Sequence, residues 1–391
     1  MSELQLLAPL TEASVADCVN ATPKVPFCLE VRRFIDALSK HLMSHVEAKA
    51  HPELVALGFW LRTAHINQLA SQQPKGLHKA LGLVLHFTPA NVDSMFVYSW
   101  VCSLLMGNNN IVRVASAESA AKSALINSLN ALFAQAQFSE IAKRNLFVSY
   151  PRESSISSEL SLHADARVIW GGDATVNAIR ALPIKPRCRD ISFADRYSAA
   201  LINGDALNDQ NQVNQLADLL WRDTKPHAQQ ACSSPRVIFW LGNTNLQQSL
   251  FEKINQLAAQ QSSDINQLNN HLAVTQVIQS CGLAGKPLVQ QAICALPIVE
   301  LKSEFLEWHM GAGLFLVQQL SGFEALPQHI DSKLQTLSYW QVDKDDLLKL
   351  SQEPSITGID RIVPVGRALE FSLVWDGVDL FKALSRSISC L

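Results

Sequence analysis

The chain has 391 residues, of which 48% are hydrophobic and 17% charged, so it can bury a core large enough for two domains or one large α/β unit. Its 32 lysines and arginines against 35 aspartates and glutamates give a formal net charge of −3, which argues against a nucleic-acid-binding surface and a polybasic membrane anchor. A small-molecule partner is therefore favoured. The eight cysteines are scattered, with no Cys-x-x-Cys pair and no Cys/His cluster at zinc spacing, which argues against a disulfide framework and a metal site.

Helical periodicity marks the first part of the chain. Apolar residues recur at helical spacing over residues 31–46, and Pro52 opens a second predicted helix. The N-terminal residues lack a basic region followed by a long apolar stretch, so we expect no secretory signal and a cytoplasmic protein. The most apolar run, residues 95–106, is too short to span a bilayer and is expected to form a buried helix.

From residue 81 onward, short apolar strands alternate with helices. We expect strands at 83–86, 111–114, 146–149 and 168–170, separated by helices at 94–106, 118–134 and 174–182. This alternation is typical of a parallel sheet with right-handed crossovers, the architecture of nucleotide-binding domains. A second α/β set is expected beyond Cys232, with helices within 245–280 and strands at 237–240, 293–299, 314–318 and 334–340.

Cys232 lies in a loop whose composition suits a nucleophile. The loop runs from His227 through Ala-Gln-Gln-Ala to Cys232, and an apolar strand follows Pro235. Small neighbours leave room around the sulfur, while Lys225, His227 and Arg236 could supply the positive field that favours a thiolate. An isolated cysteine is also often a small buried hydrophobic residue, so the loop alone does not decide between the two roles.

Three distinctive elements occur in a fixed order along the chain. Residues 82–116 contain Pro-Ala-Asn-Val after the first strand and Gly-Asn-Asn-Asn-Ile-Val-Arg in the second, and Trp-Gly-Gly-Asp and the Cys232 loop follow. In this order they resemble the LuxC family of long-chain acyl-CoA and acyl-protein reductases, a branch of the aldehyde dehydrogenase superfamily. The resemblance implies an aldehyde-dehydrogenase-like α/β fold. A helical lead-in and a Rossmann-type cofactor domain would occupy residues 1–212, joined by the C-terminal segment 361–391, and a catalytic α/β domain would occupy 213–360.

The resemblance also assigns roles to matched residues. Cys232 would be the nucleophile, and Asn91 and the backbone N–H of Cys232 would donate hydrogen bonds to the oxyanion. The cofactor-binding residues would be Thr88, Pro89, Arg113, Ser116, Gly171 and Gly172. Arg113 with Ser116, at a place where many NAD-preferring relatives carry an acid, would accommodate a 2′-phosphate, so NADPH is the expected cofactor. Asn91 is also a common turn residue after proline, and Arg113 also suits the exposed end of a strand.

A departure from the superfamily pattern bears on the reaction. Aldehyde-oxidising relatives carry a water-activating Glu in a Glu-Leu-Gly-Gly-Lys element, and the corresponding residues 191–198 contain no such element. A thioester reductase should lack it, because hydrolysis would waste the acyl enzyme. The expected activity is NADPH-dependent reduction of a fatty acyl thioester to an aldehyde through an acyl-Cys232 intermediate, without a metal ion. Expected partners are a fatty acyl-CoA or acyl-protein thioester, an acyl-activating or acyl-transferring subunit, and further copies of the chain.

Two other functions are compatible with the same residues. The sequence Gln-Ala-Cys ending at Cys232 is similar to that of caspases, although Ser233 and Ser234 break the signature. A cysteine-dependent hydrolase or acyltransferase without a nicotinamide therefore stays open, as does a non-catalytic acyl-binding subunit of a reductase complex. The charged cluster over residues 180–196 favours a solvated face, with the phosphates of CoA or NADPH as the other candidate for its partner.

Overall fold

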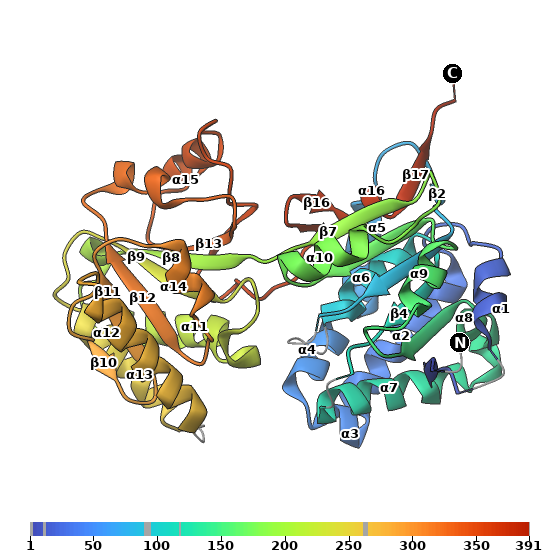
Figure 1. The fold of residues 1–391 in the computed structure, drawn as a ribbon, viewed down its shortest axis with the longest axis horizontal. Coiled ribbons are helices and arrows are strands. Elements are labelled where there is room, and N and C mark those ends of the chain that lie inside the picture. Colours follow the sequence, from blue (N-terminus) through green and yellow to red (C-terminus); the bar gives the residue numbers. More distant parts are fainter. Residues whose placement is uncertain (1–2, 11–12, 90–94, 117–118, 261–264, 391) are drawn as a thin grey trace. The chain divides into compact units, whose positions relative to one another are not determined.

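The computed structural model describes residues 3–10, 13–89, 95–116, 119–260 and 265–390 (Figure 1). Contacts divide the chain into two compact units, one formed by Met1–Ala194 with Leu373–Leu391 and the other by Asp195–Ser372. Each unit has its own, mainly parallel sheet and its own hydrophobic core. They are called the first and the second unit below.

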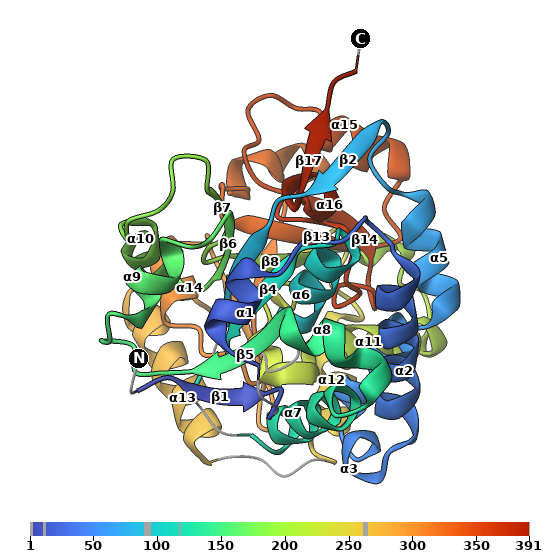
Figure 2. The same ribbon diagram turned by 90° about the vertical axis from the view of Figure 1, so that its right-hand side faces the viewer.

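A six-stranded sheet forms the centre of the first unit, in the order β1-β5-β4-β3-β6-β7. Its strands are β1 (Gln5–Ala8), β3 (Leu83–Phe87), β4 (Asn109–Arg113), β5 (Asn145–Ser149), β6 (Ala166–Trp170) and β7 (Arg189–Phe193). All neighbouring pairs are parallel except β1 with β5, which are antiparallel and lie side by side in Figure 2. Every residue of β3 and β6 is buried, as expected for strands covered on both faces.

The helices of the first unit supply the apolar surface that covers this sheet. They are α1 (Val15–Asn20), α2 (Leu29–Ser44), α3 (Val46–Lys49), α4 (Pro52–Trp60), α5 (Thr63–Ser71), α6 (Met95–Leu105), α7 (Ala120–Phe133), α8 (Ser139–Lys143), α9 (Ile156–Ser161), α10 (Asp173–Arg180) and α16 (Leu380–Ala383). Helix α2 buries residues at helical spacing, among them Phe34 and Leu38. The Phe34 ring stacks on Phe133 of α7 with centroids 5.2 Å apart. This contact packs the N-terminal helix α2 against a helix of the α/β part of the first unit.

The last strand of the chain returns to the first unit. Strand β17 (Ser385–Ile388) pairs antiparallel with β2 (Leu77–Ala80), and Figures 1 and 2 both show the two side by side. Close to this ribbon, Asn108 Nδ2 donates to the Leu384 carbonyl at 2.8 Å, and Arg189 Nη1 donates to the Ser385 carbonyl at 2.9 Å. A short hairpin of β15 (Val374–Trp375) and β16 (Val378–Asp379) precedes it.

A seven-stranded sheet forms the centre of the second unit, in the order β10-β11-β12-β9-β8-β13-β14. Its strands are β8 (Tyr197–Asn203), β9 (Pro235–Leu241), β10 (Val289–Gln290), β11 (Cys294–Ile298), β12 (Leu314–Gln319), β13 (Leu334–Trp340) and β14 (Arg361–Pro364). Only the β10–β11 pair is antiparallel among the strand pairs of this sheet in the described chain.

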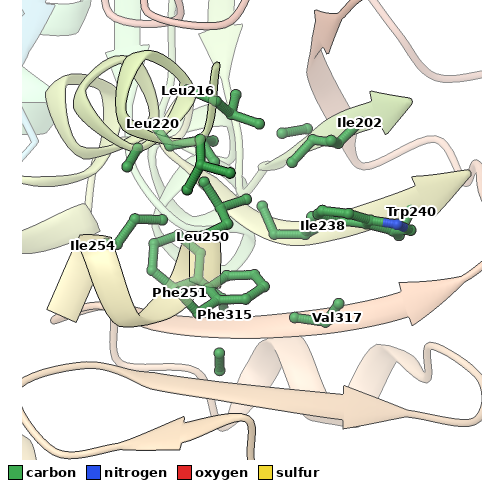
Figure 3. Packing of buried hydrophobic residues seen from close by; sticks show 14 of the residues in the cluster. Ile202, Leu216, Leu220, Ile238, Trp240, Leu250, Phe251, Ile254, Phe315 and Val317 are labelled. Atoms are coloured by element: carbon green, nitrogen blue, oxygen red, sulfur yellow. The ribbon is translucent and has the colours of Figure 1, made fainter. Parts of the chain in front are cut away.

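One core cluster of the second unit fixes the helix that leads to Cys232. The helices of this unit are α11 (Gln210–Thr224), α12 (Gln247–Ala258), α13 (Ile265–Ser280), α14 (Ser303–Glu307) and α15 (Lys344–Ser351). Figure 3 shows Leu220 of α11 and Phe251 of α12 among fully buried side chains that pack with Ile238 of β9 and Phe315 of β12. Helix α11 is therefore anchored on the central strands at the end from which the Cys232 loop departs.

The predicted alternation of strands and helices is confirmed in both sets. The sequence analysis did not predict β1, β7, β8, β10 or β14 of the two large sheets, nor the short strands β2, β15, β16 and β17. The two units also divide at other residues than the 212/213 and 360/361 boundaries expected from sequence. Strand β8 pairs with β9 and β13, and β14 pairs with β13, so residues 197–203 and 361–364 both belong to the second sheet.

None of the helices in the described parts of the chain combines the length and the apolar character that a membrane crossing requires. All eight cysteines fall within those parts, and none forms a disulfide.

Candidate active site and cofactor cavity

A cavity of about 650 Å³ opens at one edge of the sheet of the first unit. Its walls come from the segments that follow β3, β4, β5 and β6. Because parallel strands end at the same edge, these segments meet although they are far apart in the sequence. The six residues that the sequence analysis assigned to the cofactor all line this cavity: Thr88, Pro89, Arg113, Ser116, Gly171 and Gly172.

The cavity lies where the strand order of the sheet reverses. From β3 the chain adds β4 and then β5 on one side, and it later adds β6 and β7 on the other side of β3. Crossovers that leave neighbouring strands in opposite directions open a crevice at the carboxyl ends of those strands, and open α/β sheets bind their ligands there. The location is thus the one expected for a nucleotide in this class of fold.

Arg113 is held at the cavity by Tyr150. Its Nη2 donates to the Tyr150 carbonyl at 3.4 Å, and its Cζ lies 5.0 Å from the centroid of the Tyr150 ring. Its Nε is buried and has no hydrogen-bond partner among the described residues. A buried N–H without an acceptor costs free energy, so a ligand that supplies one would bind favourably here.

Thr88 has a different part in the same wall. Its hydroxyl accepts the backbone N–H of Ala115 at 3.1 Å, and its own N–H donates to the Arg113 carbonyl at 3.2 Å. Thr88 therefore ties the end of β3 to the end of β4. The hydroxyl oxygen thus takes part in the contacts that shape this wall of the cavity.

Two glycines without side chains line the cavity at the start of α10. Gly172 caps this helix with φ −64° and ψ 161°, a conformation open to any residue. A Cβ on Gly172 would meet no atom within 4 Å, whereas one on Gly171 would lie 3.1 Å from Cγ2 of Thr175. Backbone conformation does not require glycine at position 172, so its effect is to keep the N-terminus of α10 accessible, where N–H groups favour an anion.

Sequence reasoning missed several residues of the cavity wall. Gln5 is the first residue of β1, Glu3 precedes that strand, and Tyr150 and Arg152 follow β5. The Arg152 Nη2 donates to Oγ1 of Thr175. The two residues after β5 could have been predicted. That strand was expected to end at 149, and the residues after the neighbouring strands had already been assigned to the cofactor. Glu3 gave no such signal, since β1 spans only four residues.

The second unit holds Cys232 at the amino end of the central strand β9. After α11 ends, His227, Ala228 and Gln229 have φ values of 54°, 49° and 62°, all in the left-handed region. Non-glycine residues rarely adopt this conformation, and each one costs roughly 1–3 kcal/mol unless its surroundings impose it. The loop before Cys232 is therefore strained and must be held by other contacts.

Gln229 supplies those contacts. Its side chain is fully buried and makes three hydrogen bonds, each of 2.8 Å: Nε2 donates to the carbonyls of Pro235 and Leu314, and Oε1 accepts the N–H of Gly313. One side chain thus bridges the loop, the start of β9 and the start of β12.

The turn before β12 supports the loop from the other side. The N–H of Ala312 donates to the Ala228 carbonyl at 2.7 Å, and a Cβ on Gly311 would lie only 2.5 Å from the same oxygen. His309 fixes this turn: Nδ1 accepts the N–H of Gly311 at 3.1 Å and Nε2 donates to the Leu314 carbonyl at 2.9 Å. Burial lowers the pKa of His309 to about 3, so the ring stays neutral and keeps both contacts.

Cys232 itself is partly buried and contacts a neighbouring strand. Gln335 Nε2 of β13 lies 3.4 Å from its Sγ, and the hydroxyl of Ser198 donates to its carbonyl at 2.7 Å. Two guanidinium groups lie within electrostatic range of Cys232. Burial lowers the pKa of Arg236 and of Arg361, and the proximity of Cys232 acts in the opposite direction on both. Arg236 was expected from sequence, whereas Arg361 was placed there only by the structure.

The model of the LuxC acyl-CoA reductase family matches residues 43–293, a stretch that contains Cys232 and the six cavity residues named above. The chain belongs to the LuxC acyl-CoA reductase family. Its relatives include long-chain acyl-protein thioester reductases from Photorhabdus luminescens, 24% identical over 300 residues, and Aliivibrio fischeri, 23% identical over 302 residues. These matches cover 73% and 75% of this chain but 58% and 59% of the relatives, so the chain spans less than two thirds of their length.

Solved aldehyde dehydrogenases share the fold of this LuxC-family chain. The NAD-dependent aldehyde dehydrogenase of Sinorhizobium meliloti has a TM-score of 0.70 at 10% identity and covers 95% of this chain and 84% of its own. The lactaldehyde dehydrogenase of Escherichia coli has a TM-score of 0.62 at 11% identity, with 91% and 83% covered. The aldehyde-dehydrogenase-like α/β fold expected from sequence is confirmed.

The other thiols of this LuxC-family chain differ from Cys232 in their surroundings. Burial raises the pKa of Cys18 to about 12, and it also raises the pKa of Cys102 and of Cys294. Such thiols stay protonated and are poor nucleophiles. Cys281 and Cys390 are exposed, which makes them convenient references for chemical modification.

Two further expectations concern charged and polar residues. Asn91 lies outside the described residues, so its oxyanion role stays a prediction. Most of the charged cluster over 180–196 has partners within the fold: Arg189 bonds the Ser385 carbonyl, Asp190 pairs with buried Arg167 at 2.7 Å, and Lys185 pairs with Asp165 at 3.0 Å. These contacts indicate a mainly structural cluster. In residues 191–198, which the sequence analysis compared with the water-activating element, Asp195 lies 3.5 Å from Lys333.

Proposed function

We propose that this LuxC-family protein reduces a fatty acyl thioester to an aldehyde with NADPH, through a covalent acyl-Cys232 intermediate. The observation that carries the proposal is the setting of Cys232: a strained loop holds it beside an N–H donor and two guanidinium groups. Such surroundings favour a thiolate, and the residue is partly exposed. The names of the relatives, long-chain acyl-protein thioester reductases, support the same chemistry.

In the proposed reaction the Cys232 thiolate attacks the carbonyl carbon of the thioester. A bond forms between Sγ and that carbon, the bond from the carbon to the carrier sulfur breaks, and the carrier leaves as a thiolate that takes a proton from water. The side chain of Asn91 and the backbone N–H of Cys232 would donate to the oxyanion while charge develops on it. The acyl group then remains on Cys232 until it is reduced.

The cavity of the first unit is the proposed cofactor site. Its location at the reversal of strand order, the unpartnered Nε of Arg113 and the bare start of α10 all suit a dinucleotide. When bound, the nicotinamide supplies the hydride that, with a proton, converts the acyl group into an aldehyde and restores the thiol. Arg113 and Ser116 would hold the adenosine end, and the cations Arg113 and Arg152 favour a 2′-phosphate.

The proposed substrate is a fatty acyl-CoA or an acyl-protein thioester, delivered with or without an acyl-activating subunit. We further propose that the protein acts in the cytoplasm as a homo-oligomer. A cysteine hydrolase or acyltransferase, or a non-catalytic acyl-binding subunit, would give different outcomes in the assay that follows.

Purified protein is expected to oxidise NADPH only when a fatty acyl thioester is present, and to produce an aldehyde. A set of acyl-CoAs of increasing chain length and an acyl-protein donor, followed by NADPH absorbance and aldehyde trapping, makes this measurement. Release of free thiol without NADPH oxidation would replace the proposal by hydrolase or acyltransferase activity. Binding of the acyl group with neither reaction would indicate a non-catalytic subunit.

Replacing Arg113 by alanine should raise the KM for NADPH at least about tenfold more than the KM for NADH, since only NADPH carries the 2′-phosphate. Steady-state kinetics with each cofactor gives the two values. Glu3→Gln is the matched comparison, because it removes an acid from the same wall and should improve NADPH use or leave it unchanged. Equal losses with both cofactors in Arg113→Ala would mean that the side chain serves the fold through Tyr150.

A further inference from the structure

Gln335 is placed to act on the sulfur of Cys232. It is the second residue of β13, its side chain is 2% exposed, and its Nε2 lies 3.4 Å from Sγ. The other end of the amide is fixed, because the hydroxyl of Thr336 donates to its Oε1 at 3.3 Å. With the oxygen engaged by Thr336, the NH₂ group is directed at the sulfur.

A bulge in β13 explains why this side chain points toward the loop. The register between β13 and β8 shifts between Leu334 and Leu337, so Gln335 and Thr336 lie outside the regular ladder with β8, while Thr336 pairs with Arg361 of β14. Bulges commonly redirect a side chain next to an active site. The same bulge also fixes the backbone of Cys232, since Ser198 Oγ accepts the N–H of Thr336 at 3.2 Å and donates to the Cys232 carbonyl.

The charged groups around Cys232 favour a negatively charged sulfur. Arg236 of β9 and Arg361 of β14 both lie within electrostatic range of Cys232, and carboxylates lie near them: Asp195 near Arg236, and Glu370 near Arg361. These carboxylates offset part of the positive field. A hydrogen bond from a neutral amide adds stabilisation that no carboxylate cancels, and it is stronger to a thiolate than to a thiol.

We propose that Gln335 is a catalytic residue that donates a hydrogen bond to the Cys232 thiolate and holds Sγ in the orientation from which it attacks the thioester. The inference rests on the proposed function, in which Cys232 is the nucleophile, and it adds a residue that lies outside the matched family stretch of 43–293. Removing the donor should leave the loop in place, because Gln229 and the 311–313 turn hold it independently.

The test measures the rate of Cys232 alkylation by iodoacetamide against pH, in Gln335→Met and Gln335→Glu. Methionine keeps the shape without the donor, and glutamate keeps the acceptor for Thr336 but adds a negative charge. The midpoint of the curve should rise by about one pH unit in Gln335→Met, and further in Gln335→Glu. Peptides containing the exposed Cys281 and Cys390 serve as internal references, and their midpoints should not move.

Gln318→Met is the matched control. Gln318 is also 2% exposed and lies on a strand of the same sheet, but it bonds Leu301 and His329 instead of Cys232. Its loss should leave the Cys232 midpoint unchanged. Thr336→Val is measured as well, in case the Gln335 variants do not fold. This substitution keeps the Gln335 amide but removes the hydroxyl that orients the amide. It should raise the midpoint for Cys232 by a smaller amount.

Unchanged midpoints in folded Gln335→Met and Gln335→Glu, or in Thr336→Val when neither of these folds, would overturn the proposal. The outcome is separable from that of the proposed function, which is read by intact mass after incubation with an acyl-CoA. Failure of the wild type to gain an acyl group at Cys232 rejects the reductase mechanism. A shifted midpoint with normal wild-type acylation supports Gln335 specifically.

Discussion

Cys232→Ala is expected to abolish covalent acylation and acyl-dependent NADPH oxidation together. Wild-type protein incubated with a fatty acyl-CoA and no NADPH should gain one acyl mass on the peptide that contains Cys232, and added NADPH should discharge it as aldehyde. Without the sulfur there is no acceptor for the acyl group, so activity should fall by at least about a thousandfold. Intact-mass spectrometry and aldehyde trapping give the two readings.

The exposed thiols provide the control for this experiment. Cys281→Ala and Cys390→Ala should keep wild-type acylation and turnover, because neither thiol lies in the Cys232 loop. An acyl group found on another cysteine, or free fatty acid as the main product in the presence of NADPH, would contradict the reductase mechanism and favour the hydrolase.

Gln229→Met should damage both stability and chemistry. The substitution removes three buried hydrogen bonds, leaving the Gly313 N–H without its acceptor, at a cost of about 3 kcal/mol in the free energy of unfolding. The left-handed residues would also lose the contacts that impose their conformation, so Cys232 would move. A displacement of about 1 Å can cost a hundredfold in rate, and we expect a loss of that order in acylation.

Denaturant unfolding and the single-turnover rate of acylation measure the two effects. Gln230→Met is the matched control, since it changes the adjacent glutamine, whose side chain is exposed, and should alter neither quantity much. Wild-type acylation in a destabilised Gln229→Met protein would show that the loop keeps its geometry without the buried amide.

The sequence predicted those features that depend on short-range patterns. Strands β3, β4, β5 and β6 are short apolar runs bounded by turns, and the loops after β3, β4 and β6 could be assigned to one cavity because parallel strands end at one edge. Cys232 was predicted to be a nucleophile from its small, polar loop, and this role stays a prediction. In each case the information lies within about ten residues of the feature it describes.

Features that depend on long-range pairing were not predictable in this way. Gln335 and Arg361 approach Cys232 from strands more than a hundred residues later, and no local pattern marks them as neighbours. The sequence analysis placed a boundary after residue 212, whereas contacts divide the chain after Ala194, where only three residues separate β7 from β8 and no long linker marks the division. The left-handed conformation of His227–Gln229 contradicts local preference and is imposed by tertiary contacts.

The pairing of β2 with β17 has a consequence for the order in which the protein is made. Residues 77–80 leave the ribosome long before residues 385–388, and the whole of the second unit is synthesised between them. Until residues 384–388 are synthesised, the Leu384 carbonyl is missing as a partner for Asn108, and β2 keeps an open hydrogen-bonding edge. The second unit can therefore complete its sheet first. The first unit meanwhile remains an intermediate without the β2–β17 pair, and a chaperone could bind it in that state.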